Sequence, residues 1–217
     1  MTTHTVFDRR QFVTRLGLAA AMFSVPGLYA EELQRTPAQT EGPFYPDKLP
    51  LDTDNDLIVL SDSLTPAAGQ VAYVSGRILG LNGTPVRNAT VEIWQCDSGG
   101  AYLHSGTSNE EKRDKGFQGF GKFETGADGE YLFRTIKPVP YPGRTPHIHY
   151  KVKARGKELL CTQLYVKGHA GNERDGILRR LGDARDLVVK EFGPKPGGRA
   201  GELAARFDIV LGVTPEA

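Results

Sequence analysis

Two histidines separated by a single residue, His147 and His149, have the types and spacing that could do chemistry. In a β-strand the side-chain period is two, so both imidazoles would project from one face, with their Cα atoms about 6–7 Å apart. Two neutral imidazoles on one face can bind one metal ion. On a surface strand the same pair would be two ordinary polar residues that face solvent. The turn before the pair adds Arg144 and, between two prolines, Tyr141.

The metal that such a site would hold depends on its remaining ligands. The chain has only 2 cysteines in 217 residues, which excludes an all-cysteine zinc or iron–sulfur site. Two histidines with one carboxylate, from Asp97 or Glu92, would suit Fe(II). Two histidines with two tyrosinates would instead suit Fe(III), because phenolate is a hard anionic oxygen donor. A glycine-rich loop that carries Tyr102 and His104 is a second place where reactive residue types gather.

Short apolar runs separated by turn signals, which begin at Val71, predict a β-sandwich or barrel that would position these residues. We expect strands at residues 71–79, 90–96, 130–135, 147–154, 159–166 and 206–211. Asn82-Gly83 and Asp128-Gly129 predict hairpin turns, because both pairs tolerate the positive φ of a two-residue turn. Apolar residues on one side of 172–192 predict a helix there, with Asp175 on its solvated face.

The N-terminal residues predict an export signal followed by an extended arm. The twin-arginine motif Asp8-Arg9-Arg10-Gln11-Phe12-Val13 precedes an apolar run at 16–25 that is shorter than the ~20 residues needed to span a bilayer. An amphipathic first helix and an uncleaved anchor are the alternatives. Four prolines between residues 37 and 50 forbid a regular helix there. We therefore expect a signal peptide at 1–30, an N-terminal arm at 31–62, a β-sandwich domain at 63–217, and a periplasmic or extracellular location.

Charge and cysteine content restrict the partners further. The formal charge of +1 leaves no basic excess for nucleic acid or for an anionic membrane, so a small-molecule partner is expected. Cys96 and Cys161 lie on predicted strands and would either form a disulfide, which export permits, or remain two buried thiols. Trp94 is expected in the core and His169 in a loop.

Six segments carry a further pattern, and they occur in this order along the chain: Thr36-Pro37-x-Gln39-Thr40-x-Gly42-Pro43-Phe44-Tyr45, Val91-Glu92-Ile93-Trp94-Gln95, Gly99-Gly100-x-Tyr102-x-His104, Thr135-Ile136-x-Pro138-x-Pro140-Tyr141, Arg144-x-x-His147-x-His149 and Thr162-Gln163-Leu164-Tyr165. Together they resemble the intradiol ring-cleavage dioxygenases, and the protocatechuate 3,4-dioxygenase type in particular. The resemblance spans about residues 36–212, which is essentially the whole domain expected after signal removal.

The resemblance implies an all-β fold, an antiparallel β-sandwich of transthyretin-like (prealbumin-like) topology with long loops, the extended arm and one or two short helices. It also implies a non-haem Fe(III). The site residues that it implies are the metal ligands Tyr102, Tyr141, His147 and His149, the residues Arg144 and Gln163 beside the substrate, and the arm residues Gly42 and Pro43 along the substrate cavity. Tyr141 is the ligand expected to leave the metal and to accept a proton from the substrate.

The implied activity is cleavage of a catechol-type ring between its two hydroxyl-bearing carbons, with O2 as co-substrate, to a cis,cis-muconate-type dicarboxylate. The stretch from Tyr141 to His147 is short beside that of the family's protocatechuate members, which leaves the particular catechol open. One chain carries both the full ligand set and the arm motif, so a single chain or a homo-oligomer is expected. Two alternatives stay open, namely a secreted non-catalytic transthyretin-like binding module and an Fe(II) extradiol enzyme or cupin.

Overall fold

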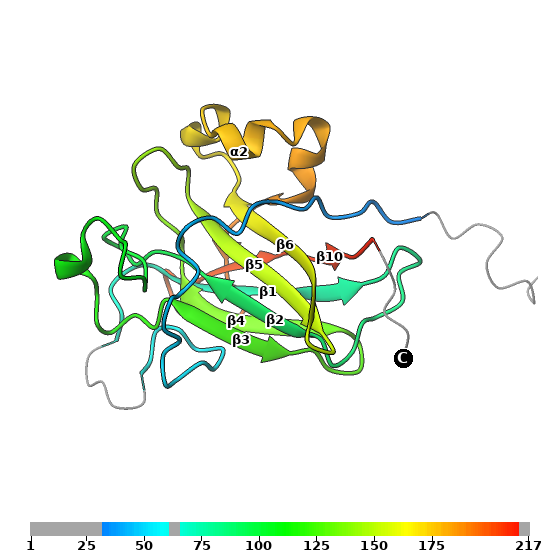
Figure 1. Cartoon of the computed structure of the whole chain (residues 1–217), viewed down its shortest axis with the longest axis horizontal. Coiled ribbons are helices and arrows are strands. Elements are labelled where there is room, and N and C mark those ends of the chain that lie inside the picture. Colours follow the sequence, from blue (N-terminus) through cyan, green and yellow to red (C-terminus); the bar gives the residue numbers. More distant parts are fainter. Residues whose placement is uncertain (1–31, 61–65, 213–217) are drawn as a thin grey trace, which may run out of the picture. The chain divides into compact units, whose positions relative to one another are not determined.

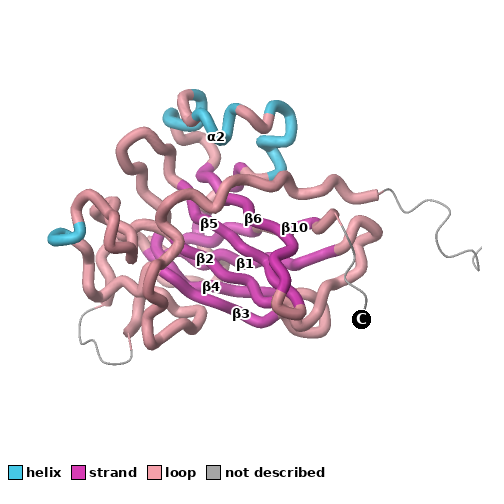
Figure 2. Tube along the Cα trace, in the orientation of Figure 1, coloured by secondary structure: helices cyan, strands magenta, loops and turns pink. Residues whose placement is uncertain are grey.

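The protein folds as two five-stranded β-sheets that pack against each other as a sandwich (Figure 1). The computed structural model describes residues 32–60 and 66–212, so the expected signal peptide at 1–30 lies outside the described residues. Strands make up the centre of the fold, and long loops and a few short helical turns surround them (Figure 2). The expected all-β sandwich is confirmed, while the division of the chain into residues 1–30, 31–62 and 63–217 stays a prediction.

The first sheet is built around β1 (Val71–Leu79). This strand pairs antiparallel with β4 (Glu130–Ile136) and parallel with both β9 (Leu203–Arg206) and β10 (Ile209–Val210), and the edge strand β8 (Gly193–Pro194) pairs antiparallel with β9. Every second residue from 72 to 78 is buried, as expected for a strand with one face on a core. The parallel pairings show that the sandwich is mixed rather than purely antiparallel.

The second sheet carries the residues of chemical interest. Its strand order is β3 (Phe120–Glu124), β2 (Thr90–Trp94), β5 (His147–Ala154), β6 (Lys157–Val166) and β7 (Val189–Lys190), and all pairs are antiparallel except β6 with β7. The register places His149 of β5 between Trp94 of β2 and Gln163 of β6, and it places His147 opposite Tyr165. Pairing alone therefore brings several predicted site residues together.

Strand β5 is buried on both faces, which is unusual for a sandwich strand. Its inward residues Ile148, Tyr150 and Val152 belong to the core between the sheets. Its outward residues His147 and His149 are also buried, at 1% and 2% exposure. A polar face of a sheet is normally solvated, so another segment must cover this one.

The covering segment is the N-terminal arm, drawn in blue in Figure 1, which has no helix or strand from residue 32 to 42 and crosses beside β6. Its backbone is fastened by three hydrogen bonds to the sandwich. Leu33 donates to the carbonyl of Leu81 at 2.9 Å, Thr36 to Val210 at 3.0 Å and Gln39 to Cys161 at 2.8 Å. The prolines keep the arm extended, and these bonds lead it from the end of β1 and from β10 in the first sheet to β6 in the second.

The sequence predictions of strands were accurate where one continuous run formed one strand. The bounds 71–79 and 147–154 match β1 and β5, whereas β3 was missed. The expected single strand at 206–211 is wrong, because β9 ends at Arg206 and the chain returns to the sheet as β10 only at Ile209. The turn at Asn82-Gly83 is confirmed, since Val86 donates back to Ile78 at 2.9 Å.

Two other local predictions are wrong. Asp128-Gly129 is a turn but not a hairpin, because it leads from β3 in one sheet to β4 in the other. The single helix expected at 172–192 is three short pieces, η2 (Ala170–Glu173), α2 (Gly176–Arg179) and η3 (Gly182–Leu187), at the top of Figure 1. Asp175 caps α2, and Gly182 with φ of +54° turns the chain out of it, so the apolar pattern is divided between separate turns.

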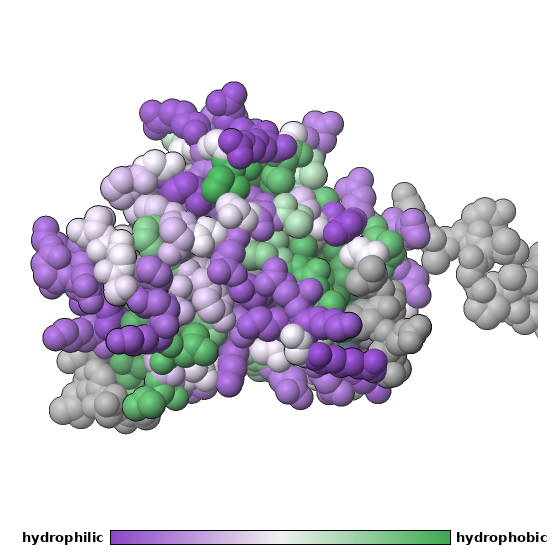
Figure 3. Space-filling model, viewed as in Figure 1, coloured by the Kyte–Doolittle hydropathy of each residue, from purple (hydrophilic) through white to green (hydrophobic). Residues whose placement is uncertain are grey.

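The outer surface is mainly hydrophilic on the face seen in Figure 3, with separate apolar patches between polar side chains. The exposed large apolar residues include Leu49, Leu51, Val59 and Leu132. No helix within residues 32–60 and 66–212 has the length and apolar character to cross a membrane.

Candidate metal centre

His147 and His149 lie on one face of β5 with their Nε2 atoms 3.1 Å apart. The Nδ1 of His147 is 2.7 Å from the carbonyl oxygen of Thr145, which can only accept, so Nδ1 carries the proton and Nε2 presents a lone pair. Burial lowers the pKa of His147 to about 3, and it lowers that of His149 as well. Both imidazoles are therefore neutral, as metal ligands must be, and the predicted shared face is confirmed.

Tyr102 reaches the histidines from the loop that follows β2. Its side chain is 1% exposed, and its hydroxyl lies 3.4 Å from the Nε2 of His147. The Asp97 carboxylate holds this loop, because one of its oxygens accepts from Gly99 at 2.8 Å and from Ala101 at 2.9 Å. Gly100, with φ of +82°, permits the sharp turn between them.

Tyr141 lies on the proline-rich turn before β5. The turn is closed by a hydrogen bond from the Arg144 backbone to the Tyr141 carbonyl at 2.9 Å. The Tyr141 ring is centred 5.4 Å from the ring of Tyr102 and 5.5 Å from that of His147. Tyr141 is half-buried, so it is the more accessible of the two tyrosines.

The chemistry of this donor set fits a hard cation. Nitrogen ligands lie about 2.0–2.1 Å from a bound transition metal, and two that share one ion at roughly a right angle are about 3 Å apart, close to the separation observed here. Burial raises the pKa of Tyr102 well above its ordinary value and also raises that of Tyr141. Neither phenol would ionise in this position unless a cation stabilised the phenolate. The four residues could therefore hold Fe(III) with two imidazoles and two phenolates.

The carboxylates of the Fe(II) alternative are engaged elsewhere. Both oxygens of Asp97 accept backbone hydrogen bonds, the second from Asp114 at 2.7 Å. Glu92 pairs with Lys153 at 2.8 Å and accepts from the hydroxyl of Tyr45 at 3.0 Å. Among the described residues, no three His, Cys, Asp or Glu side chains gather as a metal-binding group. A site with two histidines and one carboxylate thus has no support in the geometry.

The arm packs against three of the four candidate ligands, namely His149, Tyr102 and Tyr141. A Cβ added at Gly42 would lie 3.4 Å from the Cε1 of His149, and the φ of Gly42 is +74°. Phe44 stacks on Tyr102 with ring centroids 4.9 Å apart and planes 18° apart. Gly42 therefore lies against His149 and Pro43 is exposed, while their place along a substrate cavity stays a prediction.

The buried ring of Trp94 packs against His149 and restricts its orientation. Trp94 is fully buried, as expected, and its ring is stacked on His149 with centroids 4.8 Å apart and planes 7° apart.

The two remaining histidines of the described chain lie in loops. The Nδ1 of His104 accepts from the backbone of Gly106 at 2.9 Å. His169 also lies in a loop, where its Nδ1 is 3.1 Å from the hydroxyl of Thr145.

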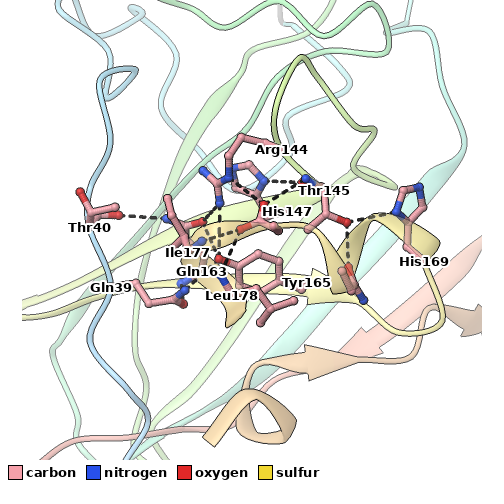
Figure 4. Close-up of polar contacts among 12 residues, drawn as sticks. Gln39, Thr40, Arg144, Thr145, His147, Gln163, Tyr165, His169, Ile177 and Leu178 are labelled. Carbon is pink, nitrogen blue, oxygen red and sulfur yellow. Dashed lines mark hydrogen bonds and ion pairs between the residues drawn. The ribbon is translucent and has the colours of Figure 1, made fainter. Parts of the chain in front are cut away.

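Arg144 and Gln163 lie together beside His147, at the centre of a hydrogen-bond network (Figure 4). Arg144 donates through Nη2 to the Gln163 carbonyl oxygen at 2.6 Å. Gln163 in turn donates to the backbone carbonyl of Thr40 in the arm at 3.0 Å, and it accepts from the hydroxyl of Tyr165 at 2.9 Å. The network thus connects the guanidinium group to strand β6 and to the arm.

Asp175 is not on a solvated helix face, and that prediction is wrong. It is 1% exposed, and its Oδ2 accepts from the Nε of Arg144 at 2.8 Å. Burial alone would raise the pKa of Asp175, but the hydrogen bond from the Leu178 backbone and the charge of Arg144 hold that pKa below its ordinary value. The available signal was local: Asp175 precedes Gly-Ile-Leu, an acidic residue at a helix start, but nothing in the sequence indicated its partner.

Two hollows adjoin the tyrosines. One of about 150 Å³ is lined in part by Phe44, Tyr102 and Tyr141. The other, of about 450 Å³, is lined in part by Tyr141, Arg144 and Asp175. Tyr141 belongs to both, so a movement of its side chain would change both spaces.

Comparison with known proteins identifies the family. A family model described as Dioxygenase matches residues 40–213, a span that contains all four candidate ligands. The chain belongs to the intradiol ring-cleavage dioxygenase family. The expected resemblance is thereby confirmed, and the family gives no support to a non-catalytic binding module.

Named relatives of this dioxygenase differ in the substrates that their names give. It is 30% identical over 242 residues to the hydroxyquinol 1,2-dioxygenase of Corynebacterium glutamicum, and the aligned region covers 96% of this chain and 74% of that relative. It is 34% identical over 168 residues to the protocatechuate 3,4-dioxygenase beta chain of Burkholderia cepacia, and the aligned region covers 73% of this chain and 71% of that relative.

Solved structures agree with the fold of this dioxygenase. The dioxygenase domain of a carbohydrate-binding fusion protein from a cellulolytic Streptomyces superposes with a TM-score of 0.63 at 32% identity, covering 82% of this chain and 98% of that domain. An intradiol ring-cleavage dioxygenase from Tetranychus urticae superposes with a TM-score of 0.64 at 22% identity, covering 82% and 95%, and shows likeness of fold alone.

Proposed function

We propose that the protein is an Fe(III)-dependent intradiol dioxygenase that acts on protocatechuate or a related catechol, with Tyr102, Tyr141, His147 and His149 as the iron ligands. The observation that carries the proposal is the convergence of two neutral imidazoles, the buried phenol of Tyr102 and the half-buried phenol of Tyr141. When bound there, iron would accept electron density from a catecholate and make the ring reactive toward O2. The product would be a cis,cis-muconate-type dicarboxylate.

The protein's own residues have separate tasks in this proposal. Tyr141 is half-buried on a turn, and its phenolate oxygen takes up one proton of the catechol, so this residue serves as ligand and as base. Tyr102 is enclosed and stays in place. The guanidinium of Arg144, which is always charged, stabilises negative charge on the bound ring. Gln163 accepts from Arg144 and fixes its direction.

The substrate class follows from the relatives, whose names give hydroxyquinol and protocatechuate. Oxygen uptake by the iron-loaded protein should be measured with catechol, hydroxyquinol and protocatechuate, and the products should be identified by mass spectrometry. A muconate-type dicarboxylate is expected. A yellow semialdehyde would contradict the proposal, because it arises from ring opening outside the two hydroxyl groups.

The ligand assignment has its own test in the visible spectrum. Tyrosinate bound to Fe(III) should give a strong charge-transfer colour, and Tyr102→Phe should remove most of it. Tyr73→Phe is a matched control, because Tyr73 lies on β1 of the other sheet. A colourless, iron-free wild-type protein after reconstitution with iron would refute the assignment.

We also propose that the protein is exported by the twin-arginine route, on the strength of Arg9-Arg10 and the apolar run that follows. Replacement of both residues by lysine should keep the protein in the cytoplasmic fraction, while Arg15→Lys should not. Export of both variants at the wild-type level would contradict this route. Light scattering of the purified protein would decide between a single chain and a homo-oligomer.

A further inference from the structure

We propose that Asp175 is a positioning residue that sets both the direction of Arg144 and the backbone that orients His147. The inference rests on the proposed function and goes beyond it, because Asp175 belongs to the segment after β6 and not to the expected site. Its carboxylate is fully buried, and the side chain of Arg144 is only 14% exposed. Forming a buried ion pair costs free energy, because both charges lose their contact with water. The presence of this pair therefore calls for an explanation.

The first step concerns Arg144, which is held at two ends. Its Nε donates to Asp175 Oδ2 at 2.8 Å, while its Nη2 donates to Gln163 at 2.6 Å. A planar guanidinium group fixed at Nε and at one Nη cannot rotate about its long side chain. Asp175 therefore determines where the positive charge points.

The second step concerns His147, which depends on the same carboxylate oxygen through Thr145. Asp175 Oδ2 also accepts from the backbone N–H of Thr145 at 3.1 Å, and the carbonyl of Thr145 accepts from the Nδ1 of His147 at 2.7 Å. Partners of this kind fix the tautomer and ring orientation of a histidine ligand. One oxygen atom thus supports a ligand and the neighbouring cation together.

The third step is that Asp175 is itself immobile. Its Oδ1 accepts from the backbones of Ile177 and Leu178 at 3.0 Å each, which begins helix α2. Leu178 is fully buried in the core and anchors that helix. A helix cap would need only the Oδ1 atom. The second oxygen, turned toward Arg144 and Thr145, is the part that a capping role leaves unexplained.

The test separates capping from positioning in the iron-loaded protein. Asp175→Ser retains a good capping residue but loses the contact with Arg144, and Asp175→Asn retains the shape but loses the charge. We expect each variant to lower kcat for catechol at least tenfold, with KM changed less than threefold. Asp183→Asn, an exposed carboxylate of the same segment, should match the wild type.

A double-mutant cycle gives the decisive readout. Because Asp175 acts in part through Arg144, Asp175→Asn should lower kcat by a smaller factor in an Arg144→Gln background than in the wild type, and the loss that remains should reflect the support of His147 through Thr145. Catechol affinity under nitrogen and the thermal midpoint should be measured for the same set. A lower thermal midpoint with unchanged kcat, or additive losses in the double variant, would overturn the inference. An inactive wild-type protein would instead refute the proposed function and the inference with it.

Discussion

Phe44 of the N-terminal arm lies nearly parallel to Tyr102, with ring centroids 4.9 Å apart. A segment about sixty residues upstream thus provides one wall of the candidate metal centre. The same phenyl ring meets Tyr141 edge-on at 6.1 Å, so it touches both phenols that would bind iron. The arm is therefore part of the site rather than a separate tail.

Removal of the Phe44 ring should speed the loss of iron from the site while lowering the stability of the domain only moderately. Phe44 is half-buried, so Phe44→Ala should cost about 1–2 kcal/mol of unfolding free energy, less than the 3–5 kcal/mol of a fully buried phenylalanine. Because the ring shields Tyr102 from water, iron should be lost to a chelator several-fold faster. Loss of the charge-transfer colour with time measures that rate.

Phe123→Ala is the matched control for Phe44→Ala. Phe123 is also half-buried and packs edge-on against Phe133 at 6.3 Å, but it lies on β3 away from the tyrosines. It should lower the unfolding free energy by a similar amount and leave the rate of iron loss unchanged. Equal rates of loss in the two variants would contradict a shielding role for Phe44.

Gly42 should not tolerate a β-branched side chain, because of both its backbone conformation and its neighbour His149. Its φ of +74° disfavours any β-branched residue, and an added Cβ would already be in van der Waals contact with the Cε1 of His149 at 3.4 Å, so the further atoms of a branched side chain would crowd the ring. Gly42→Val should therefore displace the arm from His149 and lower catechol-dependent oxygen uptake at least tenfold.

A substitution at Gly156 serves as a control, because it introduces the same backbone strain without a contact to a candidate ligand. It has a φ of +73° in the turn between β5 and β6, and no atom lies within 4 Å of an added Cβ. Gly156→Val should destabilise the protein by about 1–2 kcal/mol through the same strain and keep its activity. If Gly42→Val and Gly156→Val lowered activity equally, the loss would come from backbone strain and not from the contact between Gly42 and His149.

The pair His147 and His149 could be predicted because its geometry is local. Two residues apart on a strand means one shared face, whatever the rest of the fold does. Tyr102 and Gln163 could be placed only through a resemblance between whole motifs, since pairing between β2, β5 and β6 brings them near and no local rule gives that register. The strand pattern indicated a sandwich or a barrel, and the resemblance indicated the sandwich.

Asp175 could not be predicted for a physical reason. Its helix cap is a local interaction, but its burial depends on Arg144, which lies 31 residues earlier and is held by a second partner on β6. The apolar periodicity at 172–192 was real, yet the cap at Asp175 and the positive φ of Gly182 divided it into short turns. The local breaks thus ended the periodic pattern, and the non-local partner Arg144 accounts for the burial of Asp175.

Tyr165 should stabilise the arm through its hydroxyl group. That group accepts from Gln39 at 2.8 Å and donates to Gln163 at 2.9 Å, both in buried surroundings. Tyr165→Phe would leave the amide of Gln39 without its acceptor, at a cost of about 1–3 kcal/mol in unfolding free energy. Tyr73→Phe, which removes one long bond to Glu202 at 3.4 Å, should cost less than about 0.5 kcal/mol. Urea unfolding followed by tryptophan fluorescence would measure both, and equal losses would contradict the role of Tyr165.

Cys96 and Cys161 are separate buried thiols, so the disulfide alternative does not describe this fold. Burial raises the pKa of each thiol to about 12. The native protein should then react with a thiol reagent at pH 8 far more slowly than an unfolded chain, whose thiols have a pKa of about 8.5. We expect two thiols to react promptly in denaturant and almost none before it is added. Prompt reaction of the native protein at pH 8 would contradict the burial of both groups.

The raised thiol pKa values also give the sign of a pH effect on stability. Below about pH 8.5 both states keep their thiol protons, and the contribution of these groups to stability is fully present. As the pH rises toward 12 the unfolded chain releases protons that the native chain retains, so the free energy of unfolding falls. Replacement of both cysteines by alanine should flatten this decline between pH 9 and pH 11, as measured by urea unfolding at each pH. An unchanged slope would mean that other groups, such as the buried tyrosines, cause it.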